Sequence, residues 1–211
     1  MITVTRLLCN KIIRLLCCVV VILLYHNTAQ AVGIKEQSIV CAEKYLNVRE
    51  YTNNNDHPEI DKMLAYLGLP KRLSWCAAFV LTSYKDAAEI LKVKQPLPKY
   101  GRVASLWEYC KKNPIRYKTF TAEQVRLGLV KLQAGDVIIW KHGDVKNGDF
   151  NGHTGLNISQ INLTHIWTIE GNTLPNTSGN SGNQREGGGV YKRDRYIKSG
   201  NFSIIGFVRV N

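Results

Sequence analysis

Four polar side chains have the types and the order along the chain that nucleophilic catalysis by a thiol requires. The first of them, Cys76, opens a helical pattern in Ser74-Trp75-Cys76-Ala77-Ala78-Phe79-Val80. The first turn of a helix favours a thiolate, because its unpaired N–H groups and the helix dipole supply a partial positive charge. A nucleophilic cysteine also needs an imidazole within hydrogen-bond reach and an acceptor that orients the imidazole.

His153 is the best candidate for that imidazole. It lies in the turn Asn151-Gly152-His153-Thr154-Gly155, which leads into a predicted strand. The flanking glycines allow close approach of backbone and substrate. The other histidines after residue 31 lie in a predicted helix cap (His57) or beside apolar strand residues (His142 and His165).

Glu170 and Asn172 are the candidate orienting groups. Glu170 closes the next predicted strand, and Asn172 follows two residues later. If the strand continues, both side chains project to the same side, because side chains alternate along a strand. If the strands of His153 and Glu170 are antiparallel neighbours, these groups and Cys76 meet at one end of a sheet. The backbone N–H of Cys76 would then be a natural donor to an oxyanion.

The elements that must position these side chains form a helical first half and a strand-rich second half. Helical spacing of apolar residues and capping signals predict helices near 39–46, 58–67, 74–91, 105–112 and 121–129. Short β-rich runs predict strands at 137–140, 154–158, 165–170, 189–192 and 204–210. This order predicts an α+β fold, in which an N-terminal helical layer packs on a C-terminal antiparallel β-sheet. The Gly-, Asn- and Ser-rich stretch 171–189 predicts a long surface loop.

Residues 1–31 have the pattern of a secretory signal peptide. Basic residues precede an apolar run over 15–24, and Ala29-Gln30-Ala31 provides a small-x-small cleavage site. An uncleaved membrane anchor is the alternative, although the run is shorter than the ~18 residues of a typical span. We therefore expect residues 32–211 to be one exported domain, periplasmic or extracellular, without stable membrane insertion after cleavage. We expect this domain to be a monomer.

The charge balance is basic but does not indicate nucleic-acid binding. The 211-residue chain has a formal net charge of +12 at pH 7, which favours contact with polyanions such as cell-wall polymers. The lysines and arginines are scattered, however, and the sequence has no helix-turn-helix or RNP-like motif. We expect no nucleic-acid partner.

Three cysteines remain after residue 31, which is an odd number for an oxidising compartment. A disulfide between Cys41 and Cys110 is one hypothesis, and two buried free thiols are the alternative. Either arrangement leaves Cys76 as the reactive thiol.

An oxygen-rich segment precedes His153. Asp144, Asn147, Asp149 and Asn151 alternate in a way that could hold Ca²⁺, although a plain Asx-rich turn is the simpler interpretation. No cysteine or histidine cluster has the spacing of a zinc site. We therefore expect no cofactor.

Taken in order, these segments resemble the motifs of the CHAP family, the cysteine- and histidine-dependent amidohydrolases/peptidases. Glu170 follows His153 by 17 residues and Asn172 follows Glu170 by 2, much as in the family. The likeness covers most of residues 36–210. The sequence departs from the family pattern at Ser74, where proline is common, and at Asn157, where the residue is usually apolar. The matching blocks are residues 74–80, 135–138, 152–155 and 169–172.

The resemblance implies a papain-like fold and cleavage of bacterial peptidoglycan. It assigns Cys76 as the nucleophile, His153 as general base and then general acid, and Glu170 as the group that orients the imidazole. Asn172 would contribute either to that orientation or to the oxyanion site. The bond is either the N-acetylmuramoyl-L-alanine amide or a peptide bond of the stem or cross-bridge. The alternative function is a non-catalytic wall-binding module of the same fold.

Overall fold

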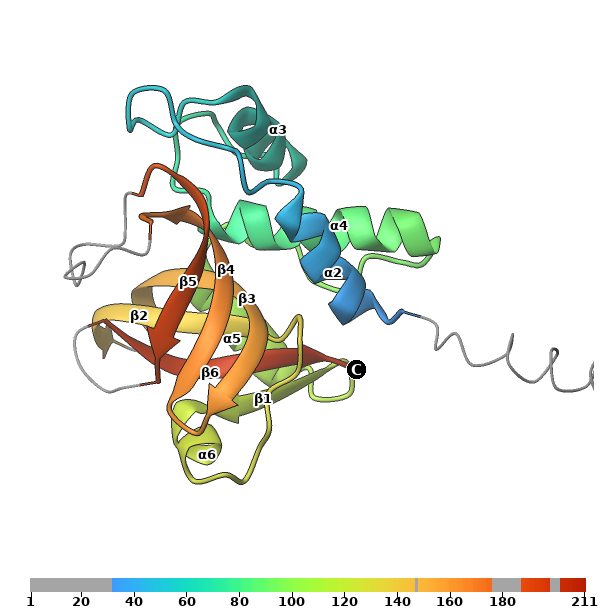
Figure 1. Ribbon diagram of the computed structural model, residues 1–211, viewed down its shortest axis with the longest axis vertical. Helices are drawn as coiled ribbons and strands as arrows, with labels where there is room; N and C mark the ends of the chain where they lie inside the picture. Colours follow the sequence, from blue (N-terminus) through green and yellow to red (C-terminus); the bar gives the residue numbers. More distant parts are fainter. Residues whose placement is uncertain (1–31, 147, 176–186, 198–201) are drawn as a thin grey trace, which may run out of the picture. The chain divides into compact units, whose positions relative to one another are not determined.

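The computed structural model describes residues 32–146, 148–175, 187–197 and 202–211 (Figure 1). The chain divides into two units, Met1–Gly33 and Ile34–Asn211. The described helices and strands belong to the second unit. The predicted signal peptide lies outside the described residues. Within the described ranges, no helix is both long and apolar enough to cross a membrane.

The α+β class is confirmed, since the chain combines helices with one antiparallel sheet. Its helices are α2 (Ile34–Glu43), α3 (Pro58–Tyr66), α4 (Cys76–Leu91), α5 (Val103–Lys112) and α6 (Ala122–Arg126). The last of these has the predicted capping box, in which Thr121 and Gln124 exchange side-chain and backbone hydrogen bonds. It ends before 129, because Gly128 adopts a positive φ of 72°.

The sheet has six strands in the order β1-β6-β2-β3-β4-β5, and every neighbouring pair is antiparallel. Most strands extend beyond the short apolar runs from which the sequence predicts them. One strand, Tyr117–Thr121, was not predicted, because this short edge segment alternates polar and apolar residues only briefly. The strands are β1 (Tyr117–Thr121), β2 (Val137–Lys146), β3 (Asp149–Asn162), β4 (His165–Thr173), β5 (Gly189–Tyr196) and β6 (Phe202–Val210). The prediction of a surface loop from residue 171 is wrong at its start, because residues 171–173 continue β4 and are buried. Residues 176–186 of the predicted loop lie outside the described residues.

Helix α4 is the element that brings the cysteine to the sheet. Its residues from Cys76 to Tyr84 are all buried, and they share a core with Leu156 of β3 and Ile169 of β4. The helix approaches β4 so closely that a Cβ on Gly171 would lie 2.6 Å from Cβ of Phe79. This contact holds the N-terminus of α4 beside the end of β4 that carries Glu170.

A second core cluster contains Trp140 of β2, Ile166 of β4 and Phe207 of β6 with Val125 of α6. The sheet is strongly curved in Figure 1, where α6 lies near one end of it. Polar residues are also buried among the strands. His153 and Glu170 are two of these buried polar residues.

Asn157, the polar departure from the family pattern, has a structural explanation. Its Nδ2 donates to the Gln133 carbonyl at 2.8 Å, and its backbone N–H donates to the Asp136 carbonyl at 2.9 Å. Asn157 therefore anchors the segment before β2 to β3. The register of the two strands is regular from Val137↔Leu156 to His142↔Asn151.

The three cysteines of the described chain are all free and buried. The hypothesis of a Cys41–Cys110 disulfide is therefore wrong for this structure, and both residues act as small apolar side chains of the core. Burial raises the pKa of Cys41, and it raises the pKa of Cys110 to about 12. Neither thiol is activated.

Candidate active site

Cys76 is the first residue of α4, as predicted, and is only 6% exposed. The preceding residue, Trp75, has a non-helical backbone (φ −120°, ψ 13°) and no side chain caps the helix. Its buried indole donates from Nε1 to Oε1 of Glu50 at 3.0 Å. Glu50 therefore fixes the residue before Cys76, a role that its sequence position alone does not reveal.

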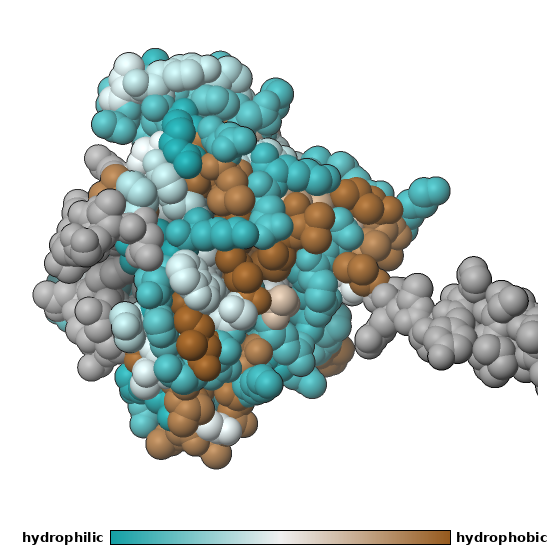
Figure 2. Space-filling model, in the orientation of Figure 1, coloured by the Kyte–Doolittle hydropathy of each residue, from teal (hydrophilic) through white to brown (hydrophobic). Residues whose placement is uncertain are grey.

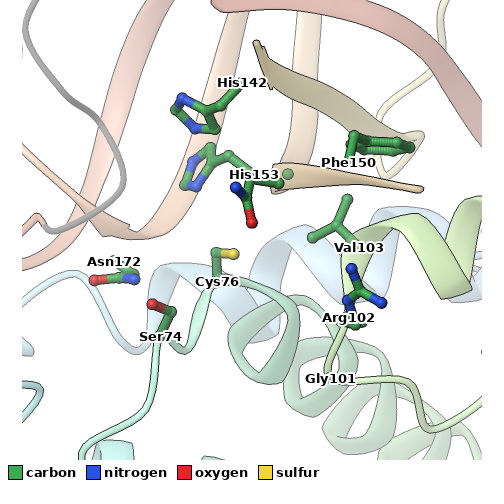
Figure 3. Close-up of a pocket in the computed structure, with 11 residues that line it drawn as sticks. Ser74, Cys76, Gly101, Arg102, Val103, His142, Phe150, His153 and Asn172 are labelled. Carbon is green, nitrogen blue, oxygen red and sulfur yellow. The ribbon is translucent and has the colours of Figure 1, made fainter. Parts of the chain in front are cut away.

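His153 and Glu170 lie on neighbouring antiparallel strands, β3 and β4. His153 Nε2 is 2.9 Å from Oε2 of Glu170, and both side chains are almost completely buried. The imidazole also lies close to the Cys76 side chain (Figure 3), and the interaction of the two side chains contributes to the pKa of each. The expected meeting of these three groups at one end of the sheet is therefore observed.

Gly155 makes room for this arrangement. A Cβ at this position would lie 2.6 Å from Cγ of Glu170 and 2.9 Å from the Ile169 carbonyl oxygen. The glycine two residues after His153 thus allows the Glu170 side chain to cross β3 and reach the imidazole.

Two residues that sequence reasoning missed complete the surroundings of Glu170. Arg195 of β5 donates from Nε to Oε1 at 2.8 Å and from Nη2 to Oε2 at 2.6 Å, and Thr168 donates from Oγ1 to Oε1 at 2.5 Å. Four donors, including His153, thus face one carboxylate. An ionised carboxylate accepts only, so His153 Nε2 carries a proton and Nδ1 is the nitrogen left to interact with the Cys76 thiol.

Asn172 does not continue the side-chain alternation of β4. The register between β4 and β5 shifts between Glu170 and Thr173, and Asn172 has a left-handed backbone with φ 55°. Its side chain consequently lines the pocket that contains Cys76, whereas Glu170 lies behind His153. The bulge therefore separates two residues that the sequence places on one side of a strand.

That pocket is a hollow of about 130 Å³ with the catalytic candidates at one wall. Figure 3 shows Ser74 and Asn172 on one side of Cys76, His153 close to it, and Arg102 and Val103 across the pocket. The other lining residues are Gly101, His142, Phe150, Asn151 and Gly152.

No protein-family model matches this chain, and no curated protein matches it. Any activity therefore has to be argued from the residues of the site. Those residues offer a buried thiol beside an imidazole whose orientation is fixed, together with helix N–H groups that no side chain caps. This set is suited to acyl transfer through a covalent thioester.

The electrostatics of the site favour a thiolate–imidazolium pair. Burial opposes charge on Cys76, but the hydrogen bond and positive charge of His153, with backbone N–H groups, outweigh it and lower the thiol pKa. Burial likewise opposes a charged His153, yet its hydrogen bonds to Cys76 and Glu170 raise its pKa to about 9. For Glu170, burial is outweighed by Arg195 and His153, which hold the pKa of the carboxyl far below its usual range.

The candidate calcium segment forms part of a β-hairpin. Residues 144–151 belong to the β2–β3 hairpin, apart from residue 147, which is outside the described residues. Asp149 pairs with Arg102 at the rim of the pocket. Within the described residues, no three His, Cys, Asp or Glu side chains converge in a way that could hold a metal ion.

Proposed function

We propose that this protein is an exported peptidoglycan hydrolase of the CHAP family that cleaves an amide bond with a Cys76-His153-Glu170 thiol mechanism. The observation that carries the proposal is the buried line of side chains from the Cys76 thiol past the imidazole to the Glu170 carboxylate, in which the imidazole and the carboxylate are hydrogen-bonded at 2.9 Å. A wall-binding module would not need this line, which costs desolvation of several charged groups.

A papain-like arrangement belongs to the same proposal. Two observations support it: the nucleophile begins a buried helix, α4, and that helix packs against strands that carry the histidine and its acceptor. We propose that α2, α3 and α4 form the N-terminal helical layer of this fold. Figure 1 shows these helices on one side of the sheet.

The mechanism begins with attack of the Cys76 thiolate on an amide carbonyl carbon. The carbonyl oxygen becomes an oxyanion, for which the Cys76 backbone N–H at the start of α4 is the proposed donor, with Asn172 nearby. His153 then gives its Nδ1 proton to the departing amine, and a thioester remains. In the second half, His153 takes a proton from water, the hydroxide attacks the thioester, and the carboxylate product leaves with the thiolate regenerated.

Digestion of peptidoglycan sacculi tests the proposal. The protein and its Cys76→Ala variant are incubated with sacculi of several chemotypes, and the soluble fragments are identified by mass spectrometry. Cysteine-dependent fragments with a new free L-alanine amine and an intact lactyl group identify an amidase; new ends within the stem or cross-bridge identify an endopeptidase. Sedimentation of the protein with sacculi without any release favours the alternative, a binding module.

Activity is expected to depend on pH through the thiolate–imidazolium pair. Because the pKa of Cys76 is lowered and that of His153 is raised to about 9, the active pair is present between these two values. Hydrolysis should therefore decrease on the alkaline side as pH rises through about 9, where the leaving amine loses its proton donor. On the acid side it should decrease as the thiolate is protonated. The profile of kcat/KM against pH with a soluble muropeptide checks this, and a rate that keeps rising above pH 10 would contradict it.

A further inference from the structure

We propose that Arg195 is a positioning residue of the candidate site, which keeps Glu170 ionised and aimed at His153 and so sets the pH range in which Cys76 is a nucleophile. This inference rests on the proposed function only for its role in catalysis. The arrangement itself, and the reactivity of the thiol, can be measured without any substrate.

The contact between Arg195 and Glu170 is a two-point pair inside the protein. Nε and Nη2 of the guanidinium each donate to a different carboxylate oxygen, at 2.8 and 2.6 Å. The Glu170 side chain is completely buried, and that of Arg195 is 10% exposed. Cζ of Arg195 also lies over the Trp140 ring, 5.7 Å from its centre, within the range of a cation–π contact. A pair of this geometry defines the direction of both carboxylate oxygens.

Without Arg195, the protonation state of Glu170 and the tautomer of His153 would change. A buried carboxylate that has lost its positive partner takes up a proton more easily, because burial penalises its charge. Protonated Glu170 would then donate to Nε2 of His153, and the proton of a neutral imidazole would have to move to Nδ1. Nδ1 is the nitrogen that faces Cys76, so the thiol would no longer have a base.

Other charged or polar side chains surround the site, and none of those described has the same contact. Arg193 of β5 lies close enough to sense Glu170, but its Nη1 donates to the Leu174 and Pro175 carbonyls. His142 of β2 and Arg102, which precedes α5, line the pocket of Cys76, and Arg102 is paired with Asp149. Apart from His153 itself, Arg195 is the positively charged side chain whose described hydrogen bonds reach the Glu170 carboxylate.

The chain also offers a matched control for the loss of a buried arginine. Arg209 of β6 makes the same two-point contact with Asp136, at 2.9 and 2.7 Å, and Asp136 is also completely buried. This pair is not among the contacts of Cys76, His153 or Glu170. Arg209→Met therefore removes an equivalent ion pair without removing a donor from Glu170.

The test measures the alkylation rate of Cys76 by iodoacetamide against pH in the full chain, with peptide mass mapping to separate Cys76 from the other cysteines. Cys41 and Cys110 are unreactive near neutral pH, because burial raises the pKa of both. In Arg195→Met we expect the apparent pKa of Cys76 to rise by at least one unit, toward the ~8.5 of a free thiol. The alkylation rate at pH 6 should then fall at least about tenfold. Arg195→Lys should keep most of the low pKa, because it retains the charge, and Arg209→Met should leave the profile unchanged.

An Arg195→Met protein that folds and keeps the wild-type alkylation profile would overturn the proposal and leave Arg195 a purely structural role. An equal rise of the apparent pKa of Cys76 in Arg209→Met would also overturn the proposal. If Arg195→Met does not fold, Arg195→Gln, which keeps one donor without the charge, is compared with Arg195→Lys by the same criterion. If the Cys76 alkylation profile depends on Arg195 as expected but the protein does not digest sacculi, the proposed function alone is rejected.

Discussion

Replacement of Cys76 by alanine is expected to lower kcat/KM for peptidoglycan fragments by about 10⁴-fold or more, with little change in the folded structure. The loss is large because the site would keep its helix N–H groups and its imidazole but would have no atom to form the thioester. The thermal transition should move little, since Cys76 contributes one small side chain at the end of a helix. Fragment release and the melting temperature are the two measurements.

A matched control for this substitution is Cys110→Ala. Cys110 is also buried and free, but it lies at the end of α5 and does not line the pocket. This variant should lose some stability through the cavity it leaves and should keep its activity. Retained hydrolysis by Cys76→Ala, or a loss of hydrolysis in both variants at full folding, would mean that the nucleophile is another group.

The second large effect is expected for Glu170→Gln, and it combines lost activity with lost stability. An amide in place of the carboxylate leaves Arg195 buried without a counter-charge, for which the usual penalty is about 3–5 kcal/mol of unfolding free energy. It also removes the acceptor that stabilises the imidazolium, so kcat should fall by roughly 10²- to 10⁴-fold. Urea unfolding at pH 7 and turnover of a muropeptide measure the two effects.

The loss of stability in Glu170→Gln should depend on pH in a definite direction. The folded pKa of Glu170 is depressed, so its ionisation stabilises the fold above the unfolded pKa of about 4.3, and this contribution is lost as pH falls through the folded value. The stability difference between wild type and Glu170→Gln should therefore narrow in acid. Asp136→Asn is the control: it breaks the equivalent pair with Arg209 and should destabilise the protein while the thiol chemistry survives. Wild-type stability and turnover in Glu170→Gln would contradict the role assigned to this residue.

The candidates Cys76, His153 and Glu170 could be predicted from sequence because each lies in a local sequence pattern that indicates its place in the fold. Cys76 begins a helical pattern, His153 stands between glycines before a predicted strand, and Glu170 closes the next predicted strand. In the structure both strands are longer, so His153 lies inside β3 and Glu170 lies inside β4. Local periodicity also identified α4 and five of the six strands. The antiparallel pairing of β3 and β4, which brings His153 and Glu170 together, could be stated only as a condition.

The supporting residues could not be predicted, because their roles depend on pairing between distant segments. Arg195 lies in Val190-Tyr191-Lys192-Arg193-Asp194-Arg195, where arginines in a polar edge strand are usually solvated. Only the pairing of β5 with β4 turns it inward, toward Glu170. Asn172 was misplaced for a related reason, since a bulge in one strand leaves no mark in the alternation of its sequence.

The distribution of the site over the chain has a consequence for folding. The thiol, its base, the carboxylate and the guanidinium come from α4, β3, β4 and β5, so the contacts between them are non-local and depend on closure of long loops. Until β5 has docked beside β4, Glu170 lacks its counter-charge, and the cysteine keeps the ordinary reactivity of an unfolded chain. Under the proposed mechanism, a nascent or partly folded polypeptide is therefore expected to remain inactive until β5 has paired with β4.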